Sequence, residues 1–450
     1  MDTQELSGPE EPCRTKVNPF DFFSELLREN SDQVIHMVLN FDGRLDQKKM
    51  QCAVMEAIIR EPVCKSRLVE ANDTLWWDPS SSLHTRDYFS VLQKTDLDSA
   101  LADTLSEIID PTHGPQLKVF LLQSIEGMGD VLVINASHVA MDGSGLKDMA
   151  RLIMRLYHHP WEGSSCTRDG KPGLNRELPL ISTLLPYSDE TEGKDWHAPA
   201  RDPWTFPAQS IETQRQVLAI MMVPGPRVAS IHTKRRELGV TVNDLMLAVV
   251  ALACANLEIE KNQQERSFLN TIDMRRYCTV SERSVTNYST AFEVRIPVRH
   301  TDTLSSLCGV VHEIMENKKR DCPGRRDALD AERLWKSGVS TARETLRNRE
   351  TDPENHEARI QIFTNTGIIN LDQTNHWSPH VTNACLLPCH APPPAIFIAV
   401  STFMDTMTIS VTYHRPAVAD EQVRLFFEQV HRILPGYPGE DDTWQLQFVS

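Results

Sequence analysis

The sequence predicts a mixed α/β protein made of two halves, each an α/β sandwich. Segments with strand character and segments with helical periodicity interleave along the chain, without strict βαβ alternation. The chain has 450 residues, more than the roughly 250 to 300 beyond which a single core stops growing. We therefore predict an N-terminal half at 1–175 and a C-terminal half at 215–450. The connection between them, at 176–214, is rich in proline and charged residues.

The first half shows both kinds of periodicity. An amphipathic helix is predicted at 18–29, and a helix with regular apolar spacing at 45–61. Strands are predicted at 34–43, 115–125 and 130–138. The short segment EGMGD connects the last two strands, and its glycines favour a hairpin.

The second half repeats this mixture. Thr241 or Asn243 can cap a strongly apolar, buried helix. Strands are predicted at 215–224, 267–274, 289–298, 395–404 and 406–415. Helices are predicted at 227–239, 241–258, 304–317 and 419–434.

Composition excludes several classes of protein. Acidic residues outnumber basic ones by 62 to 46, which gives a net charge of -16. This balance disfavours binding to nucleic acid or to an anionic membrane, and it favours a soluble monomer. The acidic, polar start lacks the features of a signal peptide, and no apolar run approaches the ~18 residues that span a bilayer, so we expect a cytoplasmic protein without a membrane span. No Gly-rich phosphate loop is present, so no NTP or NAD site is expected.

Ten cysteines are scattered without a paired framework, which favours reduced thiols over disulfides. The densest group of candidate metal ligands comprises His376, His380, Cys385, Cys389 and His390. One interpretation is a zinc site. Structural zinc sites usually space their cysteines by two to four residues within compact turns, however, and the segment LLP stands between these two. We therefore predict a loop with packed cysteines and no metal.

The segment 316–350 carries ten basic residues against seven acids. It fits a solvated helix-loop-helix surface whose charges pair at helical spacing. The alternative is a basic rim that receives a phosphorylated cosubstrate, with Arg325 and Arg326 as the candidate contacts.

One histidine stands where an apolar strand ends and a helix begins. His138 is followed by Asp142 and Gly143, and apolar residues then recur at intervals of three and four over 146–156. A rigid strand end followed by an open turn is a common place for reactive groups. The alternative is a buried histidine whose nitrogens are satisfied by the backbone of the turn.

The string SHVAMDG resembles the HxxxDG motif of the superfamily that includes chloramphenicol acetyltransferase, nonribosomal peptide condensation domains, wax ester synthases, polyketide-associated acyltransferases and alcohol acetyltransferases. Other segments are similar to the family in order and spacing: FDGRLDQKKMQCAVMEAIIREPVCKSRL, DPTHGPQLKVFLL, GVTVNDLMLAVVALACA, LNTIDMRRY, TNYSTAFEVRIPV and FTNTGIIN. The resemblance covers nearly the whole chain.

The resemblance implies that two chloramphenicol-acetyltransferase-like halves meet at a central tunnel. His138 would be the general base that deprotonates an acceptor alcohol, or less readily an amine, as it attacks a thioester. The backbone N–H of Gly143 would hold the oxyanion. The donor would be acyl-CoA or a phosphopantetheine thioester on an acyl carrier protein, with no permanently bound cofactor.

The resemblance also gives Asp142 a structural role, as the partner of Arg275 from the other half, with Arg276 as the alternative. Asn287 matches a further family position. The sequence departs from condensation domains, which usually carry two histidines, because Ser137 takes the first place, and it lacks the DFGWG element of plant acyltransferases. The ester-forming alcohol acetyltransferase and polyketide-associated branches, enzymes typical of secondary metabolism, are therefore the nearest. A non-catalytic binding module and an amide-forming condensation enzyme are the alternatives.

Overall fold

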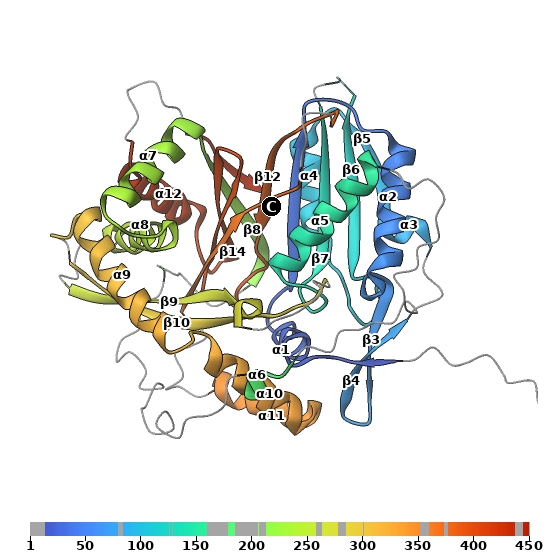
Figure 1. Cartoon of the computed structure of the whole chain (residues 1–450), viewed down its shortest axis with the longest axis horizontal. Coiled ribbons are helices and arrows are strands. Elements are labelled where there is room, and N and C mark those ends of the chain that lie inside the picture. Colours follow the sequence, from blue (N-terminus) through green and yellow to red (C-terminus); the bar gives the residue numbers. More distant parts are fainter. Residues whose placement is uncertain are drawn as a thin grey trace, which may run out of the picture.

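The computed structural model describes residues 14–79, 84–125, 127, 129–159, 179–184, 206, 213–257, 263–277, 285–299, 301–351, 360–372, 377–436 and 444–449. Within these residues the strands form a five-stranded, a seven-stranded and a three-stranded sheet. The two larger sheets stand side by side (Figure 1). The predicted mixed α/β architecture is thereby confirmed.

The N-terminal sheet has the order β12-β2-β7-β6-β5. Its strands are β2 (Val34–Phe41), β5 (Phe89–Lys94), β6 (Leu117–Ser124), β7 (Asp130–Ser137) and β12 (Val381–Leu387). The helices α2 (Gln47–Arg60) and α5 (Gly143–His158) pack together on one face, and α4 (Leu97–Leu105) packs on the other. The predicted hairpin is the antiparallel pair β6 and β7.

The C-terminal sheet has the order β10-β9-β11-β13-β14-β8-β15. Its strands are β8 (Thr213–Val223), β9 (Gln263–Asp273), β10 (Ser289–Arg299), β11 (Gln361–Ile368), β13 (Phe397–Phe403), β14 (Thr406–Pro416) and β15 (Leu446–Val449). Its helices are α7 (Gly225–Glu237), α8 (Val242–Asn256), α9 (Leu304–Arg320) and α12 (Asp420–Ile433). Thr241, not Asn243, caps α8: its side chain accepts from the Asp244 N–H, and the Asp244 carboxylate accepts from the Thr241 N–H.

The remaining elements lie around these sheets. The small sheet joins β1 (Thr15–Lys16), β4 (Thr74–Pro79) and β3 (Ser66–Ala71). The short helices are α1 (Pro19–Leu27), α3 (Thr85–Tyr88), α6 (Ile181–Leu184), α10 (Arg325–Ser337) and α11 (Val339–Thr351), with 3-10 helices at Pro62–Lys65 and Met274–Tyr277. Helices α1 and α10 pack together below the two large sheets (Figure 1).

Strand β12 joins the two halves in a way that the sequence did not predict. It comes from the C-terminal part of the chain, yet it pairs antiparallel with β2, so that Cys385 lies opposite Val38. The chain then returns to the C-terminal sheet as β13. Apolar side chains of both sheets, among them Val38, Leu218 and Leu387, form one buried cluster between the halves. Most of the predicted connection at 176–214 lies outside the described residues.

No single described helix is long and apolar enough to cross a membrane, although the bent pair of α7 and α8 passes that test by length and composition. In the structure the apolar side chains of α8 are buried in the C-terminal core.

Candidate active site

His138 lies directly after β7, at the junction of the two halves. Its backbone N–H donates to the carbonyl of Gln33, which precedes β2, at 2.7 Å. The side chain is partly exposed, while the neighbouring Ser137 and Val139 are buried. The backbone of His138 is therefore fixed by the sheet, and its ring keeps access to solvent.

Asn287 lies on one side of this imidazole. The Asn287 Nδ2 donates to the His138 carbonyl oxygen at 2.9 Å and lies 3.4 Å from Nδ1 of the ring. The same Nδ2 donates to the Ser24 hydroxyl at 2.8 Å, and the Asn287 Oδ1 accepts from the Ser289 N–H at 3.3 Å. Within the described residues the His138 Nε2 makes no hydrogen bond.

Burial lowers the pKa of His138 below its usual value, and the negative charge of Asp142 partly opposes that change. The imidazole is therefore neutral at ordinary pH, which is the state that can accept a proton.

Asp142 caps the start of α5 and is buried. Its Oδ1 accepts from the Gly145 N–H at 2.9 Å. Its Oδ2 accepts from the Tyr288 N–H at 2.8 Å and from the Arg275 Nη1 at 2.6 Å. Burial would raise the pKa of this carboxyl, but the Arg275 charge and these hydrogen bonds hold it below its usual range. Neither oxygen hydrogen-bonds His138, so the geometry of a triad is absent among these described residues.

Arg275 connects α5 to the second half through several bonds. Its Nη2 donates to the Thr286 carbonyl at 2.6 Å, and its Nη1 also lies 3.0 Å from the Asp273 Oδ1. Asp273 in turn accepts from the Ser144 hydroxyl at 2.9 Å. The pair expected from the family resemblance is thus formed by Arg275, whereas Arg276, the alternative, is exposed.

The two glycines at the start of α5 have different surroundings. A Cβ on Gly145 would lie 3.0 Å from the Thr286 carbonyl oxygen and 3.0 Å from the Met141 Cβ. A Cβ on Gly143 would meet only Leu386, at an ordinary 3.4 Å. The Gly143 N–H makes no hydrogen bond within the described residues, so it can donate to a developing oxyanion.

Several contacts that hold the site could not be inferred from local sequence. Gln33, Thr286 and Tyr288 bond the segment 137–145 from distant parts of the chain. Ser24 bonds Asn287 beside it. The sequence pointed only to Asn287, next to Thr286, because Asn287 matches a position of the family that the chain resembles. Ordinary polar residues in strands and helices give no such signal, because their partners depend on tertiary packing.

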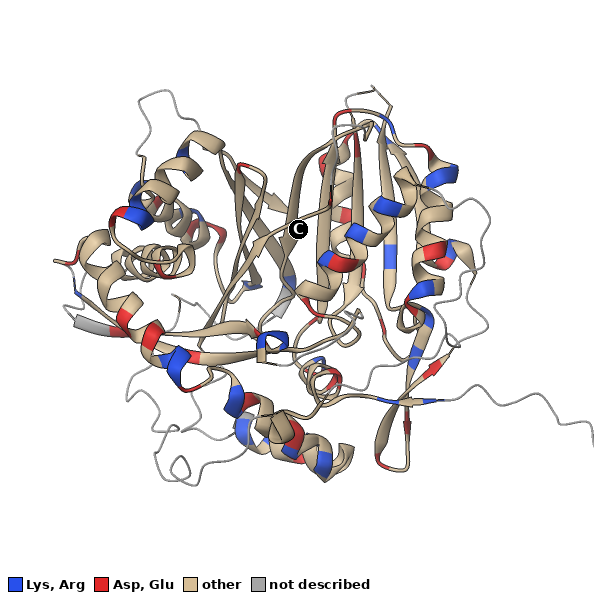
Figure 2. Ribbon diagram, viewed as in Figure 1, with Lys and Arg blue, Asp and Glu red and all other residues tan. Residues whose placement is uncertain are grey.

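Arg325 and Arg326 begin α10, close to the 3-10 helix that carries Arg275. Gly324, just before them, approaches Ile272 and Thr290 so closely that a Cβ would lie 2.6 Å from each side chain. Its positive φ of 81° further favours glycine. Basic and acidic residues are interspersed along α10 (Figure 2).

Many other cations of the basic segment 316–350 are paired with acids. These pairs are Lys319 with Glu316, Arg333 and Arg349 with Asp330, Arg343 with Glu29 and Glu70, and Arg347 with Glu29. The interpretation as a surface of paired charges accounts for these residues.

Among the described residues, the candidate zinc ligands form no metal-binding group. His376 lies outside the described residues, and no group of three potential ligands that could hold a metal occurs in the described part of the chain. Cys385 and Cys389 are buried, and burial raises the pKa of each thiol to about 12. They behave as packed apolar thiols.

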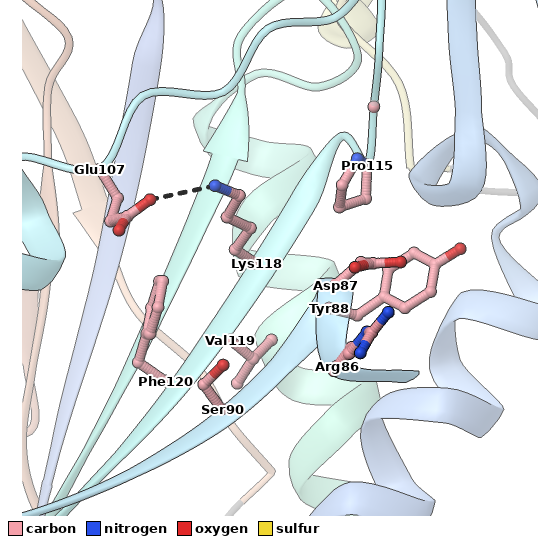
Figure 3. A pocket seen from close by; sticks show the side chains of 10 residues that line it. Arg86, Asp87, Tyr88, Ser90, Glu107, Pro115, Lys118, Val119 and Phe120 are labelled. Atoms are coloured by element: carbon pink, nitrogen blue, oxygen red, sulfur yellow. Dashed lines mark hydrogen bonds and ion pairs between the residues drawn. The ribbon is translucent and has the colours of Figure 1, made fainter. Parts of the chain in front are cut away.

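A cavity of about 430 Å³ lies at the β5–β6 side of the N-terminal sheet (Figure 3). Arg86, Asp87, Glu107 and Lys118 contribute opposite charges to its lining, and Lys118 pairs with Glu107 at 3.1 Å. His138 does not line this cavity. Because its charges balance and partly pair with each other, the cavity does not define a ligand.

No protein-family model matches the sequence, and no curated protein matches it significantly. Solved structures match across almost the whole chain. The trichothecene 15-O-acetyltransferase TRI3 from Fusarium sporotrichioides has a TM-score of 0.74 at 14% identity, covering 94% of each chain. The first condensation domain of the calcium-dependent antibiotic synthetase has a TM-score of 0.68 at 12% identity, covering 94% of this chain and 96% of its own. Polyketide synthase associated protein 5 from Mycobacterium tuberculosis has a TM-score of 0.64 at 11% identity, covering 95% of this chain and 100% of its own.

The chain therefore has the fold shared by these acyltransferase and condensation-domain structures, as the HxxxDG resemblance implied. At these identities the similarity defines the fold, and the chemistry has to be argued from the site.

Proposed function

We propose that this protein is a thioester-dependent acyltransferase that forms an ester, with His138 as the general base. The observation that carries the proposal is the place of His138 at the end of β7 and close to the start of α5, with its Nε2 unbonded in the described residues. Burial lowers the pKa of His138, which favours the neutral ring. Such a group is suited to take a proton from an acceptor hydroxyl at neutral pH.

In the proposed reaction the acceptor hydroxyl gives its proton to the His138 Nε2 as its oxygen attacks the thioester carbonyl carbon. The oxyanion that forms is stabilised by the Gly143 N–H, at the positive end of the α5 dipole. The C–S bond then breaks, and the departing thiolate takes the proton back from His138. No covalent enzyme intermediate and no permanently bound cofactor are required.

Asp142, Arg275 and Asn287 act in this proposal as positioning residues. Asp142 and Arg275 fix the start of α5, and therefore Gly143, relative to the second half. Asn287 fixes the carbonyl of His138. Asp142 does not orient the imidazole through a hydrogen bond in this proposal, because its oxygens accept from Gly145, Tyr288 and Arg275 and not from His138.

The donor would be acyl-CoA or an acyl group on the phosphopantetheine of a carrier protein, and the acceptor a small alcohol. The position of Arg325 and Arg326 beside the 3-10 helix supports a role for them in holding a donor phosphate. Ser137, in place of a second histidine, disfavours amide formation of the condensation-domain type.

A panel of acyl-CoA donors with mixed alcohols, followed by the release of free thiol, tests the function. We expect acceptor-dependent release by the wild type and a loss of about 10²- to 10⁴-fold in His138→Ala, the usual effect of removing a general base. His113→Ala is the matched control, because His113 is exposed on the surface. Absence of acceptor-dependent release with every donor, carrier-bound donors included, would favour a non-catalytic binding module. Turnover by His138→Ala close to the wild-type rate would contradict the mechanism.

A further inference from the structure

Three histidines are buried together where the two halves meet. His36 comes from β2, His390 from the crossover segment 388–396 between β12 and β13, and His414 from β14. They are 3%, 8% and 5% exposed, respectively. The rings of His390 and His414 contact each other edge to face, with centroids 5.4 Å apart. We call these three residues the histidine cluster.

The hydrogen bonds of the cluster suit neutral rings. His36 Nδ1 lies 2.8 Å from the Asn135 Oδ1, and the Asn135 Nδ2 donates to the Thr104 carbonyl at 2.6 Å. The amide of Asn135 is thereby oriented, so His36 carries its proton on Nδ1 and leaves Nε2 as a lone pair. Both ring nitrogens of His390 and the Nε2 of His414 are buried and make no hydrogen bond of good geometry in the described part of the chain, although the Val217 backbone partly opposes the fall in the pKa of His390.

A small cavity adjoins the cluster. It measures about 40 Å³ and is lined by His36 and His390 together with Ser106, Gln216 and Thr412. These residues come from both halves, so the cavity lies in the contact between them. It is large enough for about one water molecule, and it brings uncharged polar groups, not carboxylates, to the rings.

The charged and titratable groups around the cluster would do little to stabilise a positive charge on its rings. From the start of β2, Asp32 accepts the His390 N–H through its backbone carbonyl, at 3.3 Å. The crossover adds the buried thiol of Cys389. On β14 the next residue, Arg415, is a cation paired with Asp420, and on β8 Arg215 is exposed. The residues of α4 and β15 that line the cavity, among them Val449, carry no charge.

The pKa values agree with this environment. Burial lowers the pKa of His36 to about 4 and that of His390 to about 3, and the neighbouring histidines lower the latter further. The pKa of His414 is lowered by burial as well. Burial raises the pKa of Asp32 to about 6, so Asp32 also takes up a proton as the solution becomes mildly acidic. Protonation of Asp32 has the opposite effect on stability, because a carboxyl with a raised pKa favours the folded state as the pH falls.

We propose that the histidine cluster is an acid-sensitive contact that releases the crossover segment 388–396 from the junction of the two halves. Protonation places cations side by side in a buried site whose neighbouring buried carboxyl, Asp32, itself becomes neutral as the pH falls. The release is transmitted to the site, because the backbone at 32–33 holds both the His390 N–H and the His138 N–H. The inference does not depend on the proposed acyl transfer, since its test measures no activity.

Hydrogen exchange of the wild-type chain at about pH 7.5 and about pH 5, corrected for the intrinsic pH dependence of exchange, tests this proposal. A histidine with an ordinary pKa near 6.5 when released and near 4 when buried shifts the opening equilibrium about thirtyfold over this range. We expect the amides of His390, Ala391 and the facing part of β14 to lose protection by at least that factor.

The variant His390→Gln should remove the share of one histidine, about thirtyfold, from this pH dependence. His113→Gln is the matched control, because His113 is exposed and pairs with Asp110 on the surface. Asp32→Asn should increase the pH dependence, because it removes the opposing group. An unchanged pH dependence in His390→Gln would overturn the proposal. If that variant does not fold, the wild type decides: equal protection of these amides at both pH values would overturn it.

Discussion

The start of α5 and the basic segment 316–350 both depend on ion pairs, but they bury them to very different degrees. The side chains of Asp142 and Arg275 are 2% and 12% exposed, whereas those of Asp330 and Arg333 are 23% and 75% exposed. Water competes for the second pair and is largely excluded from the first. The buried pair therefore positions the backbone at the start of α5, whereas the exposed pair on α10 contributes little to stability.

The largest effect that tests this contrast is the loss of the buried pair. Truncation of Asp142 or Arg275 to Ala removes the main partner of a buried charge, although Arg275 keeps Asp273 and Asp142 keeps two backbone N–H donors. We expect each change to cost up to about 3 to 5 kcal/mol of unfolding free energy. A cycle of Asp142→Ala, Arg275→Ala and the double variant, measured by denaturant unfolding, should give a coupling above about 1 kcal/mol. Strictly additive losses would show that the pair does not position the two halves.

Asp142→Asn separates positioning from a catalytic triad. A triad role predicts a lower kcat with an unchanged melting temperature, because only the tautomer of His138 would suffer. The bonds to Arg275 and the Tyr288 N–H predict that activity and melting temperature fall together. Measuring both quantities on one preparation decides between the two outcomes.

The same pair should give stability a dependence on acid. The pKa of Asp142 is lower in the folded chain than its ordinary value, so its stabilising contribution is complete above the ordinary range near ~3.9. This contribution is lost as the pH falls through the folded pKa. Melting curves of the wild type and Asp142→Asn should therefore converge in strong acid, and a constant difference at all pH values would contradict the assignment.

The next effect concerns the two glycines of α5. Gly145→Ala places a Cβ 3.0 Å from the Thr286 carbonyl oxygen, which belongs to the backbone and cannot move freely. We expect a loss of about 1 to 3 kcal/mol, as for other overpacked sites. Gly143→Ala, whose Cβ would meet only the Leu386 side chain at 3.4 Å, is the control and should unfold within about 0.5 kcal/mol of the wild type. Equal losses in the two variants would mean that Thr286 is not held against α5.

A smaller effect, on the donor KM, tests whether the basic segment 316–350 contacts the donor. If Arg325 and Arg326 hold a donor phosphate, changing both to Gln should raise the donor KM several-fold with little change in kcat, because such contacts are equal in the ground and transition states. Arg343→Gln and Arg347→Gln, in the adjoining α11, are the matched control of equal charge. An unchanged donor KM would show that Arg325 and Arg326 do not hold a donor phosphate and belong to the solvated surface.

The smallest effect is expected at an exposed pair. Arg343 pairs with Glu29 and Glu70, and all three side chains are partly exposed. Arg343→Ala should change the unfolding free energy by about 0 to 1 kcal/mol, and less at high salt. A loss of unfolding free energy as large as that of Arg275→Ala would show that exposed and buried ion pairs stabilise this chain equally.

The sequence by itself determined many of the helices and strands, and the motif. Period-two and three-to-four apolar patterns located strands such as β6 and β7 and the helix after Gly143, because local periodicity reports which face of an element is buried. His138 at a strand end and the pair of Asp142 with Arg275 followed from HxxxDG and its neighbours, since the family resemblance preserves their order along the chain.

Only the tertiary structure decided which distant segments meet. The exchange of β12 into the N-terminal sheet, the anchoring of His138 by Gln33 and the burial of His36 beside His390 have no local signal. The sequence predicted packed cysteines in a loop, with zinc as the alternative. Both thiols are buried, but Cys385 lies within strand β12 and not in a loop. Short-range patterns encode burial, whereas the choice of partner comes from the packing of the whole chain.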